Sequence, residues 1–372
     1  MTDSAARVIL HAFPTFEIGG AQMRTVQLIN HFGRKYRHRI VTMNGGSAAF
    51  ARLDAAVDAK ILDVPVVHGR SLANLSVFRR KLMDWKPDLL VTSNWGTIDW
   101  ALANLVVGVP HLHMEDGFGP EESDRQLPRR VWIRRLTLRR STILLPSLTL
   151  CAIARQQWRM PEAGLLYVPN GIDCDRFATP PDWEFARGYG MAPGEPIVGT
   201  VAGLRAEKNV RRLIDAFAVV TQRRPSRLVV VGDGAERGAL TEHARSLGLA
   251  DRVIFTGNCT SPEKLLSCFD IFALSSDTEQ MPLSILEAMA AAKPIAATNV
   301  GDVANMVAAE NHPYVVERDA GRLAQAILAL LDDPGLAAGL GKANAQRARE
   351  TFAQQRMFDS FENLYDGGVA RR

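Results

Sequence analysis

Two glutamates stand out for their type and spacing: Glu279 and Glu287, in the segment SSDTEQMPLSILEAMAAAKPIAATNVGD at 275–302. Glu279 lies in a polar loop after the apolar run DIFALSS, and Glu287 lies one turn into a segment of helical periodicity. A helix amino terminus presents free N–H groups that attract anions such as a diphosphate. Because carboxylates on either side of a diphosphate accept hydrogen bonds from sugar hydroxyls, the segment predicts a nucleotide-sugar site.

Both carboxylates also have a purely structural interpretation. Ser284 and Glu287 form the pattern S-x-x-E, which is typical of a capping box that satisfies N–H groups at the start of a helix. Glu279 alone is compatible with a solvated loop carboxylate. The position of both, after an apolar strand and beside a helix start, favours the functional interpretation.

A second strand-to-helix turn is rich in glycine. In RLVVVGDGAERGAL, Gly232 and Gly234 directly follow an apolar run, where small residues permit a tight turn and close approach of backbone N–H groups to phosphate. The third glycine, Gly238, comes one position too late for G-x-G-x-x-G, and no acidic residue ends the next strand. The turn therefore suits a phosphate, and NAD binding is disfavoured.

Other arrangements of reactive side chains indicate no further chemistry. Asp173 and Asp175 form a D-x-D triplet, but they lie in VPNGIDCD and away from any phosphate-binding turn, so we expect no metal. The four cysteines form no C-x-x-C pair and no zinc spacing, which is typical of reduced cysteines in a cytosolic protein. The G-x-S-x-G turn of serine hydrolases is absent.

Length and composition indicate an ordinary globular protein of two domains. The chain has 372 residues, 47% hydrophobic and 23% charged, which excludes a mainly disordered, collagenous or coiled-coil chain. One domain usually takes about 150 residues. A net charge of +4 suits anionic partners without requiring nucleic acid, and we expect no nucleic-acid partner. We expect neither a signal peptide nor a membrane span, which needs ~20 apolar residues.

Short apolar runs alternate with segments of helical periodicity along the whole chain. This repetition predicts an α/β protein in which helices cover both faces of parallel sheets. A stretch rich in Pro, Gly and Asp at 168–196 is where we expect a linker between two doubly wound domains. Ligands bind such sheets outside the carboxyl ends of the strands. The expected strands are RVILHAF, HRIVTM, DLLVTSN, VPHLHM, TILLP and LLYVP before this stretch, and IVGTVAG, RLVVVG, RVIFTG, DIFALSS and PIAATN after it.

Taken together, these segments resemble the retaining glycosyltransferases of glycosyltransferase family 4. Glu279, seven intervening residues and Glu287, followed by KP and VGD, are similar to the E-x7-E signature of that family. The resemblance implies the GT-B fold, with two Rossmann-like doubly wound domains facing across a cleft. Further matching pieces occur in the family's order over essentially the whole chain: GGAQ at 19–22, VPNGID at 168–173, LRAEKN at 204–209, VVVGDG at 229–234 and VIFTGN at 253–258.

The expected domains follow from this resemblance and from the linker. An acceptor-binding domain spans 1–172 and is joined by a terminal helix at 352–368. A nucleotide-sugar-binding domain spans 190–351. Because TFAQQRMFDSFENLY follows another helical run at 334–350, a break near residue 350 is required.

For the donor, the resemblance implies that Glu279 contacts the sugar and Glu287 the nucleotide ribose. Arg205 and Lys208 then neutralise the diphosphate, on which charge builds as the glycosidic bond breaks. The other implied donor-binding positions are Gly203, where the family often has arginine, the turn glycines Gly232 and Gly234, the backbone N–H groups of Met281 and Leu283, and Ser284.

In the amino-terminal domain, the resemblance implies that Gly19 and Gly20 let the first β-α loop approach the transferring sugar. The family tends to place a histidine near the sugar, at the end of a strand. In VPHLHMEDGFGPEE, the register that aligns the next glycine places Asp116 there, which makes it the first choice for the sugar-facing catalytic role. His113 is the second choice, and it also fits an ordinary buried strand histidine.

The implied reaction is transfer of a hexose-type sugar from a nucleotide diphosphate sugar to a hydroxyl, with retention at the anomeric carbon. The family is thought to use front-face attack helped by the leaving diphosphate, without a protein nucleophile. No cofactor or metal is expected besides the donor substrate. The base, the sugar and the acceptor stay open.

The segment RQLPRRVWIRRLTLRR at 125–140 contains seven arginines with apolar side chains such as Trp132 and Leu136. A solvated amphipathic helix explains this pattern. Docking on anionic lipid explains it too, because each basic residue near such a surface contributes about 1 kcal/mol and apolar side chains enter the interface. Docking suits a lipid-linked sugar acceptor and a cytoplasmic enzyme, peripheral on the inner membrane face, that assembles a surface polysaccharide or glycolipid.

Other classes of function stay open at this point. A sugar-nucleotide epimerase of the same fold converts the donor without an acceptor. A non-catalytic nucleotide-sugar-binding protein keeps the phosphate-binding residues and lacks the sugar-facing ones. An NAD-dependent oxidoreductase predicts nicotinamide binding, which the late third glycine disfavours.

Overall fold

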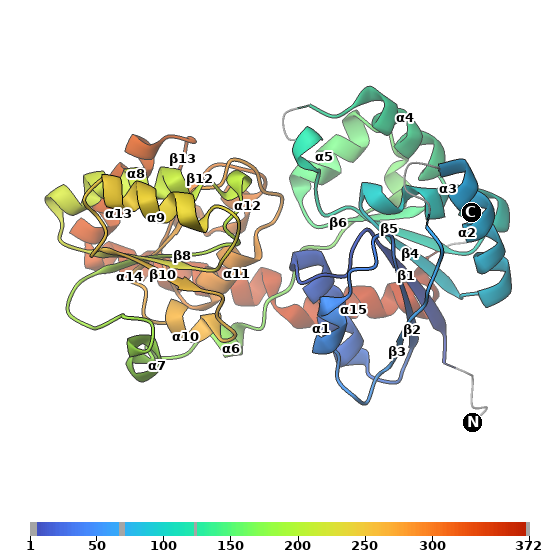
Figure 1. The fold of residues 1–372 in the computed structure, drawn as a ribbon, viewed down its shortest axis with the longest axis horizontal. Helices are drawn as coiled ribbons and strands as arrows, with labels where there is room; N and C mark the ends of the chain where they lie inside the picture. Colours follow the sequence, from blue (N-terminus) through green and yellow to red (C-terminus); the bar gives the residue numbers. More distant parts are fainter. Residues whose placement is uncertain (1–5, 67–70, 123–124, 370–372) are drawn as a thin grey trace. The chain divides into compact units, whose positions relative to one another are not determined.

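A computed structural model of the chain describes residues 6–66, 71–122 and 125–369. The chain forms two compact units (Figure 1). Unit 1 comprises Met1–Pro169 and Met357–Arg372, and unit 2 comprises Asn170–Arg356. Each unit is built around one parallel sheet, so the α/β class expected from the alternation of apolar runs and helices is confirmed.

In the described residues of unit 1, the sheet has seven parallel strands. They are β1 (Val8–Phe13), β2 (Arg37–Thr42), β3 (Asp58–Ile61), β4 (Leu89–Ser93), β5 (His111–Met114), β6 (Thr142–Leu145) and β7 (Leu165–Tyr167). Their order is β3-β2-β1-β4-β5-β6-β7. The chain therefore builds outward from β1 in one direction and then from β4 in the other, which makes the β1/β4 boundary a topological switch point.

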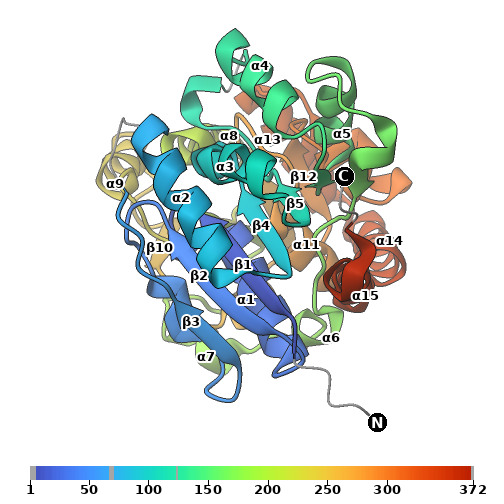
Figure 2. The same cartoon turned by 90° about the vertical axis from the view of Figure 1, so that its right-hand side faces the viewer.

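Helices cover both faces of this sheet. They are α1 (Gly20–Phe32), α2 (Ser71–Trp85), α3 (Ile98–Val107), α4 (Pro128–Thr137), α5 (Leu148–Gln156) and α15 (Gln354–Asn363), with short helices η1 (Ala48–Arg52), η2 (Trp95–Thr97), η3 (Pro120–Glu122), η4 (Glu162–Gly164) and η7 (Leu364–Gly368). On one face, Phe32 of α1 packs with Phe358 of the terminal helix α15. On the other, α2 and α3 lie side by side (Figure 2), and the rings of Phe78 and Trp100 stack 4.2 Å apart.

The sheet of unit 2 has six parallel strands. They are β8 (Ile197–Val201), β9 (Arg227–Val231), β10 (Val253–Gly257), β11 (Ile271–Leu274), β12 (Ile295–Thr298) and β13 (Val315–Val316). Their order is β10-β9-β8-β11-β12-β13, so the direction of building reverses between β8 and β11. That boundary is the switch point of unit 2.

The helices of unit 2 also lie on both faces of their sheet (Figure 1). They are α6 (Cys174–Phe177), α7 (Trp183–Arg187), α8 (Val210–Arg223), α9 (Arg237–Ser246), α10 (Pro262–Leu266), α11 (Leu283–Ala290), α12 (Val303–Met306), α13 (Ala320–Asp332) and α14 (Pro334–Phe352), with η5 (Ala206–Lys208) and η6 (Ala309–Tyr314). Helices α8, α9 and α13 share one core with the sheet, and α6, α10, α11 and α14 share the other.

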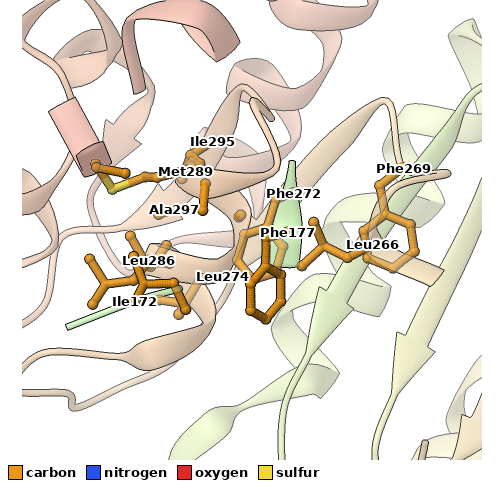
Figure 3. Packing of buried hydrophobic residues seen from close by; sticks show 14 of the residues in the cluster. Ile172, Phe177, Leu266, Phe269, Phe272, Leu274, Leu286, Met289, Ile295 and Ala297 are labelled. Atoms are coloured by element: carbon orange, nitrogen blue, oxygen red, sulfur yellow. The ribbon is translucent and has the colours of Figure 1, made fainter. Parts of the chain in front are cut away.

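The continuous apolar sequence of β11 is explained by burial on both faces of the sheet. Phe272 and Leu274 face the core shown in Figure 3, where Phe177 and Leu266 pack beside them. The alternate residues Ile271 and Ala273 face the core on the opposite side of the sheet. A parallel strand between two helical layers is buried on both faces, which favours unbroken hydrophobic sequence over alternation.

The predicted strands are present to within two residues at each end. Two strands, β3 and β13, are missing from the prediction, and both lie at an edge of their sheet. The sequence of β3 is DAKI, with two charged residues, and β13 has only two residues. Edge strands contact one neighbour and are half solvated, so a strong apolar pattern is not required of them.

Residues 170–196, where the sequence suggests a linker, fold onto unit 2. Ile172, Phe177 and Met191 lie in its core, and the backbone of Ile172 pairs with that of Ala353. Weak helical periodicity here reflects two helices of only four and five residues, α6 and α7. The helical run expected at 334–350 ends at Phe352, and α15 begins at Gln354.

A glycine in the central strand of unit 2 permits a close contact. A Cβ atom on Gly199 would lie 2.1 Å from ring carbons of Phe269, which is 2% exposed. Real Cβ atoms do not approach other carbons this closely, so the absence of a side chain lets the ring lie against β8.

We expect Gly199→Ala to destabilise unit 2 by about 1–3 kcal/mol, because the added methyl overpacks the core against Phe269. The measurement is urea unfolding followed by circular dichroism. The control is Gly238→Ala within α9, where a Cβ meets nothing within 4 Å; it should be neutral or slightly stabilising. Equal midpoints for Gly199→Ala and the wild type would contradict this account of the strand.

Candidate functional site

The switch point of unit 2 brings the loops after β8 and β11 together, and with them two of the predicted residues. Nζ of Lys208 lies 2.5 Å from Oε1 of Glu279, and the two side chains are only 19% and 10% exposed. Ser276 donates a hydrogen bond of 2.8 Å to the same carboxylate oxygen. Because β8 and β11 are neighbours, residues 71 positions apart in the chain meet at one edge of the sheet.

A small hollow of about 10 Å³ lies at this edge, enough for roughly one water molecule. Polar groups dominate its mouth. Its lining includes Thr200, Lys208, Ser275, Ser276, Glu279 and Ser284. The hollow therefore gathers an ammonium, a carboxylate and hydroxyls around one point. The ammonium and the hydroxyls can donate hydrogen bonds to phosphate oxygens, and the carboxylate can accept them from sugar hydroxyls.

The backbone that carries Lys208 is tightly turned. Lys208 ends η5, and the next residue, Asn209, adopts φ 40° and ψ 49°, in the left-handed region. Asn209 is also the N-cap of α8, because its side-chain oxygen accepts a hydrogen bond of 3.1 Å from the N–H of Arg212. The lysine is thus positioned by a short helix on one side and a capped helix start on the other.

Arg205 does not join Lys208 at the carboxylate. Its side chain is 64% exposed and forms an ion pair of 2.7 Å with Glu207 in the same loop. The structure therefore brings Lys208 and Glu279 together and leaves Arg205 near the surface of this loop. Its implied contact with a diphosphate stays a prediction.

The capping-box interpretation of Ser284 and Glu287 is wrong. Helix α11 begins at Leu283, its N-cap is Pro282, and no side chain caps it. Ser284 is consequently a residue of the first helical turn and cannot act as the N-cap. The N–H groups of Leu283 and Ser284 lie among the first four of the helix, which have no partner within the helix itself.

Glu287 lies one turn along α11 from Ser284, on the same side of the helix. Burial raises the pKa of Glu287 to about 7, although the Arg176 guanidinium lowers it; Glu263 raises it further. A carboxyl group that is desolvated to this degree gains from accepting hydrogen bonds when it ionises. This environment is compatible with the implied contact to ribose hydroxyls.

Met281 has a different setting from its neighbours in the E-x7-E segment. Its side chain is buried, and Asn170 donates hydrogen bonds of 3.2 Å both to its sulfur and to its backbone oxygen. The residue thereby joins the start of unit 2 to the loop before α11. Its implied N–H contact with the donor stays a prediction.

The turn glycines after β9 have a packing role. A Cβ atom on Gly232 would lie 2.0 Å from the backbone oxygen of Ala202, and one on Gly234 would lie 2.4 Å from that of Leu204. Gly203 lies between those two residues and has open space around its own Cβ position. The glycine pattern therefore lets the loops after β8 and β9 touch backbone to backbone, whether or not a phosphate binds there.

The VGD segment supports the Glu279 loop in the same way. Gly301 adopts φ 53°, and a Cβ atom there would lie 2.3 Å from the backbone oxygen of Glu279. The N–H of Asp302 donates a hydrogen bond of 2.9 Å to the backbone oxygen of Gln280. Only glycine accommodates both the positive φ and the close approach.

In unit 1, the predicted residues lie around the β1/β4 switch point. Asp116 follows β5 and forms a two-pronged ion pair with Arg24 of α1, with N···O distances of 2.7 and 3.0 Å. The Asp116 N–H donates to the side chain of Asn94, directly after β4. Sequence reasoning did not identify Arg24 or Asn94, because neither lies in a recognisable motif.

His113, the second choice for the sugar-facing role, is fully buried in β5. Its Nδ1 lies 2.8 Å from the hydroxyl of Thr92, and its Nε2 lies 3.5 Å from Glu115. Asp116 is the more accessible of the two, with 16% of its side chain exposed. Next to Asp116, an open hollow is lined by side chains including Asn94, Trp95, Phe118 and Arg130.

Gly19 and Gly20 lie where the first β-α loop becomes helix. Gly20 begins α1 and Gly19 is its N-cap, in an extended conformation with no side-chain cap. A Cβ atom on Gly19 would lie 2.8 Å from the side-chain oxygen of Gln22, whose amide donates to the backbone of Thr15. The absence of a side chain at Gly19 leaves this amide room to bind the loop.

The D-x-D triplet has local structural partners. The carboxylate of Asp173 caps α6 by accepting from the N–H groups of Asp175 and Arg176, and Asp175 pairs with Arg349 at 2.7 Å. Within residues 6–66, 71–122 and 125–369, no three His, Cys, Asp or Glu side chains cluster in a way that would hold a metal ion.

The arginine-rich segment forms α4, and its side chains divide between interior and surface. Arg134 is fully buried: it pairs with Glu115 at 3.1 Å, and its guanidinium lies 5.0–5.4 Å from the ring centroids of Trp95, Phe118 and Trp158. Arg130 pairs with Glu121 and Glu122. These two arginines are structural, so they are not available to a membrane surface.

The opposite side of α4 is exposed. Trp132 is 62% and Leu136 51% exposed. Within the segment 125–140, Arg125, Arg129, Arg139 and Arg140 are exposed as well. In the described part of the chain, no single helix is long and apolar enough to cross a bilayer; α13 and α14 pass that test only as a pair, which is bent by 105°.

The raised pKa of Glu287 predicts a pH dependence of stability. Its ordinary value is 4.5 and its folded value about 7, so stability present below pH 4.5 is lost as the pH rises to about 7. The loss amounts to at most about 3.5 kcal/mol, at about 1.4 kcal/mol per pKa unit. We expect Glu287→Gln to unfold at higher urea concentration than the wild type at about pH 8 and to differ less at about pH 5.

The control for this measurement is Glu310→Gln, at an exposed position of η6. It should leave the pH dependence of the urea midpoint unchanged. A wild-type midpoint that does not fall across this pH interval, or a Glu287→Gln variant with the same profile, would show that Glu287 is not desolvated.

Comparison with known proteins matches both units to sugar-transferring enzymes. Residues 18–176 match the family model described as Glycosyltransferase Family 4, and residues 195–333 match the one described as Glycosyl transferases group 1. The two matches together span most of the chain and include the E-x7-E segment.

Curated relatives cover part of the chain. N-acetyl-alpha-D-glucosaminyl L-malate synthase from Bacillus anthracis is 28% identical over 206 residues, which are 55% of this chain and 54% of that protein. GDP-mannose-dependent alpha-(1-6)-phosphatidylinositol monomannoside mannosyltransferase from Mycobacterium tuberculosis is 31% identical over 199 residues, 50% of this chain and 51% of that protein. The chain thus spans about half the length of the curated relatives that it matches.

Among solved structures, the UDP complex of Alr3699/HepE from Anabaena superposes with a TM-score of 0.82 at 20% identity, over 96% of this chain and 99% of that one. This likeness concerns the fold. With two parallel α/β sheets, family models matching on both units and an E-x7-E segment at a switch point, the chain belongs to the glycosyltransferases of family 4 and has the GT-B fold.

Proposed function

We propose that this protein transfers a hexose-type sugar from a nucleotide diphosphate sugar to a hydroxyl, with retention at the anomeric carbon. The observation that carries the proposal is the ion pair between Lys208 and Glu279 at the β8/β11 switch point. It combines a cation for phosphate with a carboxylate for sugar hydroxyls, beside the start of α11. Its location is the edge at which doubly wound sheets bind ligands.

In the proposed reaction, the bond between the anomeric carbon and the diphosphate oxygen breaks as the acceptor oxygen bonds to the same face of that carbon. The acceptor hydroxyl proton passes to the leaving diphosphate. Lys208 and the N–H groups at the start of α11 stabilise the charge that builds on the diphosphate, with Arg205 as a further cation of the same loop. Glu279 orients the sugar, and Glu287 accepts hydrogen bonds from the ribose.

Transfer is favoured over the two alternatives of related fold. Family models described as glycosyltransferases match both units, and the two curated relatives named above are a synthase and a mannosyltransferase by name. An epimerase needs no acceptor. A binding protein without catalysis requires no cation close to the leaving group. Lys208 is held beside Glu279, the carboxylate that we expect to contact the sugar, so its charge lies close to the bond that breaks.

The proposed partners are a nucleotide-sugar donor and a lipid-linked sugar acceptor. The Anabaena neighbour was solved with UDP, and the Mycobacterium tuberculosis relative is named for GDP-mannose and a phosphatidylinositol mannoside. Both uracil and guanine donors therefore belong in the test. We further propose that no resident metal takes part, because Lys208 and the α11 start already oppose the diphosphate charge.

We also propose that the protein works in the cytoplasm, attached to the inner face of a membrane through α4, in surface polysaccharide or glycolipid assembly. Trp132 and Leu136 are the exposed apolar side chains of that helix. The exposed arginines beside them suit an anionic lipid surface. This attachment uses the outer side of α4, because Arg130 and Arg134 are engaged inside unit 1.

We expect Lys208→Ala to lower kcat for sugar transfer by roughly 10²–10³-fold, as does loss of one group that stabilises transition-state charge. The measurement is release of UDP or GDP from a panel of their sugars, with membrane extract as the acceptor source. A thermal-shift panel selects the donor, since a ligand at about a hundredfold its Kd stabilises by about 2.7 kcal/mol.

The control for this prediction is Lys342→Ala, at an exposed position of α14. It should retain wild-type turnover. The double variant Arg205→Ala, Lys208→Ala tests whether Arg205 adds to the effect. Undiminished turnover of that double variant would refute the assignment, and donor conversion to an epimer without any acceptor would replace it.

We expect binding to vesicles that contain anionic lipid and weaker binding when salt rises, since the Debye length falls from about 10 Å at 0.1 M to about 3 Å at 1 M. Trp132→Glu should reduce sedimentation with vesicles by about tenfold or more, because it removes an apolar anchor and adds a negative charge. Val219→Glu, an equally charged change on the exposed side of α8 in unit 2, is the control. Binding that ignores lipid charge and salt would defeat the proposal.

A further inference from the structure

We propose that Asp277 is a positioning residue that holds Lys208 against Glu279, an inference that rests on the proposed sugar-transfer function. Asp277 lies two residues before Glu279 in the loop after β11. It contacts the loop after β8 through both its side chain and its backbone. Asp277 therefore connects the two loops that flank the switch point.

The carboxylate of Asp277 has two partners at the start of α8. One oxygen accepts a hydrogen bond of 2.9 Å from the side-chain amide of Asn209, and the other accepts one of 2.6 Å from the guanidinium of Arg212. The side chain of Arg212 is 15% exposed and that of Asp277 38%, so only the arginine side of this ion pair is shielded from water.

The backbone of Asp277 adds two further links. Its N–H donates a hydrogen bond of 2.9 Å to the backbone oxygen of Glu207, the residue before Lys208. Its carbonyl accepts one of 3.2 Å from Arg318. The peptide that carries Asp277 is thus fixed to η5 on one side and to the segment before α13 on the other.

Residues next to Asp277 strengthen the same connection. The hydroxyl of Ser275 donates a hydrogen bond of 3.2 Å to the backbone oxygen of Lys208. Arg212 donates one of 2.7 Å to the backbone oxygen of Ser275. Lys208 is therefore anchored through its own carbonyl as well as through its neighbours.

The connection between Asp277 and Lys208 depends on the side chain of Asn209. Its left-handed backbone, at φ 40°, is one that glycine adopts at lower cost. The asparagine has a use for both ends of its amide: the oxygen caps α8 at the N–H of Arg212, and the nitrogen donates to Asp277. The amide orientation is consequently determined, and it transmits the position of Asp277 to the residue that follows Lys208.

The function of these contacts around Asp277 follows from how precisely the ammonium group of Lys208 must be placed. The negative charge that Lys208 opposes develops on the leaving diphosphate only as the bond breaks, so misplacement weakens the transition state more than the bound donor. A displacement of about 1 Å costs about 10²-fold in rate at sites of this kind. Asp277 has its partners in α8 and η5, and it acts on the reaction through Lys208.

We expect Asp277→Ala to lower kcat by about tenfold or more while KM for the donor changes by less than about threefold. Asn209→Gly, which keeps the left-handed backbone and deletes the amide link, should show the same division between kcat and KM. The double variant should lose about as much as either single variant, because both remove one connection. Asp277→Asn, which keeps an acceptor for Arg212, should recover part of the loss.

The matched control is Asp332→Ala, which removes an exposed aspartate–arginine pair of unit 2 with Arg224, and it should retain wild-type kcat. Melting temperatures of all variants establish that they fold. If Asp277→Ala does not fold, Asn209→Gly still tests the same connection. Unchanged kcat in both variants, or a change confined to KM, would overturn the role of Asp277. Failure of the wild type to transfer sugar from any donor would instead refute the proposed function itself.

Discussion

The pairing of β8 with β11 is the constraint on which the candidate site of unit 2 depends. The chain lays down β9 and β10 on one side of β8 and β11 to β13 on the other, so the loops after β8 and β11 diverge from a common edge. Both residues of the Lys208–Glu279 pair, and the residues Asn209, Arg212 and Asp277 that hold Lys208, belong to these loops or to the start of the helix that follows β8. No other pair of neighbouring strands in unit 2 offers this geometry, because every other adjacent pair is also consecutive along the chain.

Close backbone contacts connect the loops at the edge of the sheet that carries Lys208 and Glu279. Glycines at 232 and 234 let the loop after β9 approach the loop after β8, and Gly301 lets the loop after β12 approach the loop after β11, to distances that a Cβ atom would forbid. The resulting frame accommodates two unfavourable features, a left-handed asparagine and a desolvated carboxyl group on α11. Such features persist only where surrounding contacts over-determine them, and they gather at sites that bind or react.

Unit 1 uses charge in a different way. The carboxylates of Glu115 and Glu122 lie inside the protein, where Arg134 and Arg130 neutralise them and aromatic rings cover the Arg134 guanidinium. Leaving either charge unpaired there would be costly, so the arginines anchor α4 to the loop that carries Asp116. The same helix presents an apolar and basic outer side, so one segment serves the interior and the surface with opposite faces.

The α/β class, eleven strands, the family and the segments that meet at the switch point can be read from the residues alone, because buried parallel strands and strand-to-helix turns restrict residue types locally. The edge strands β3 and β13 were not predicted, since their partial exposure relaxes that restriction on residue type. The contacts of the polar side chains became known from the folded chain: Ser284 and Glu287 form no capping box, Lys208 rather than Arg205 pairs with Glu279, and Arg134 is buried while Trp132 is exposed. Several of these outcomes depend on partners far away in the chain, 71 residues for Lys208 and Glu279 and 92 residues for Arg24 and Asp116, and no local pattern encodes such pairings.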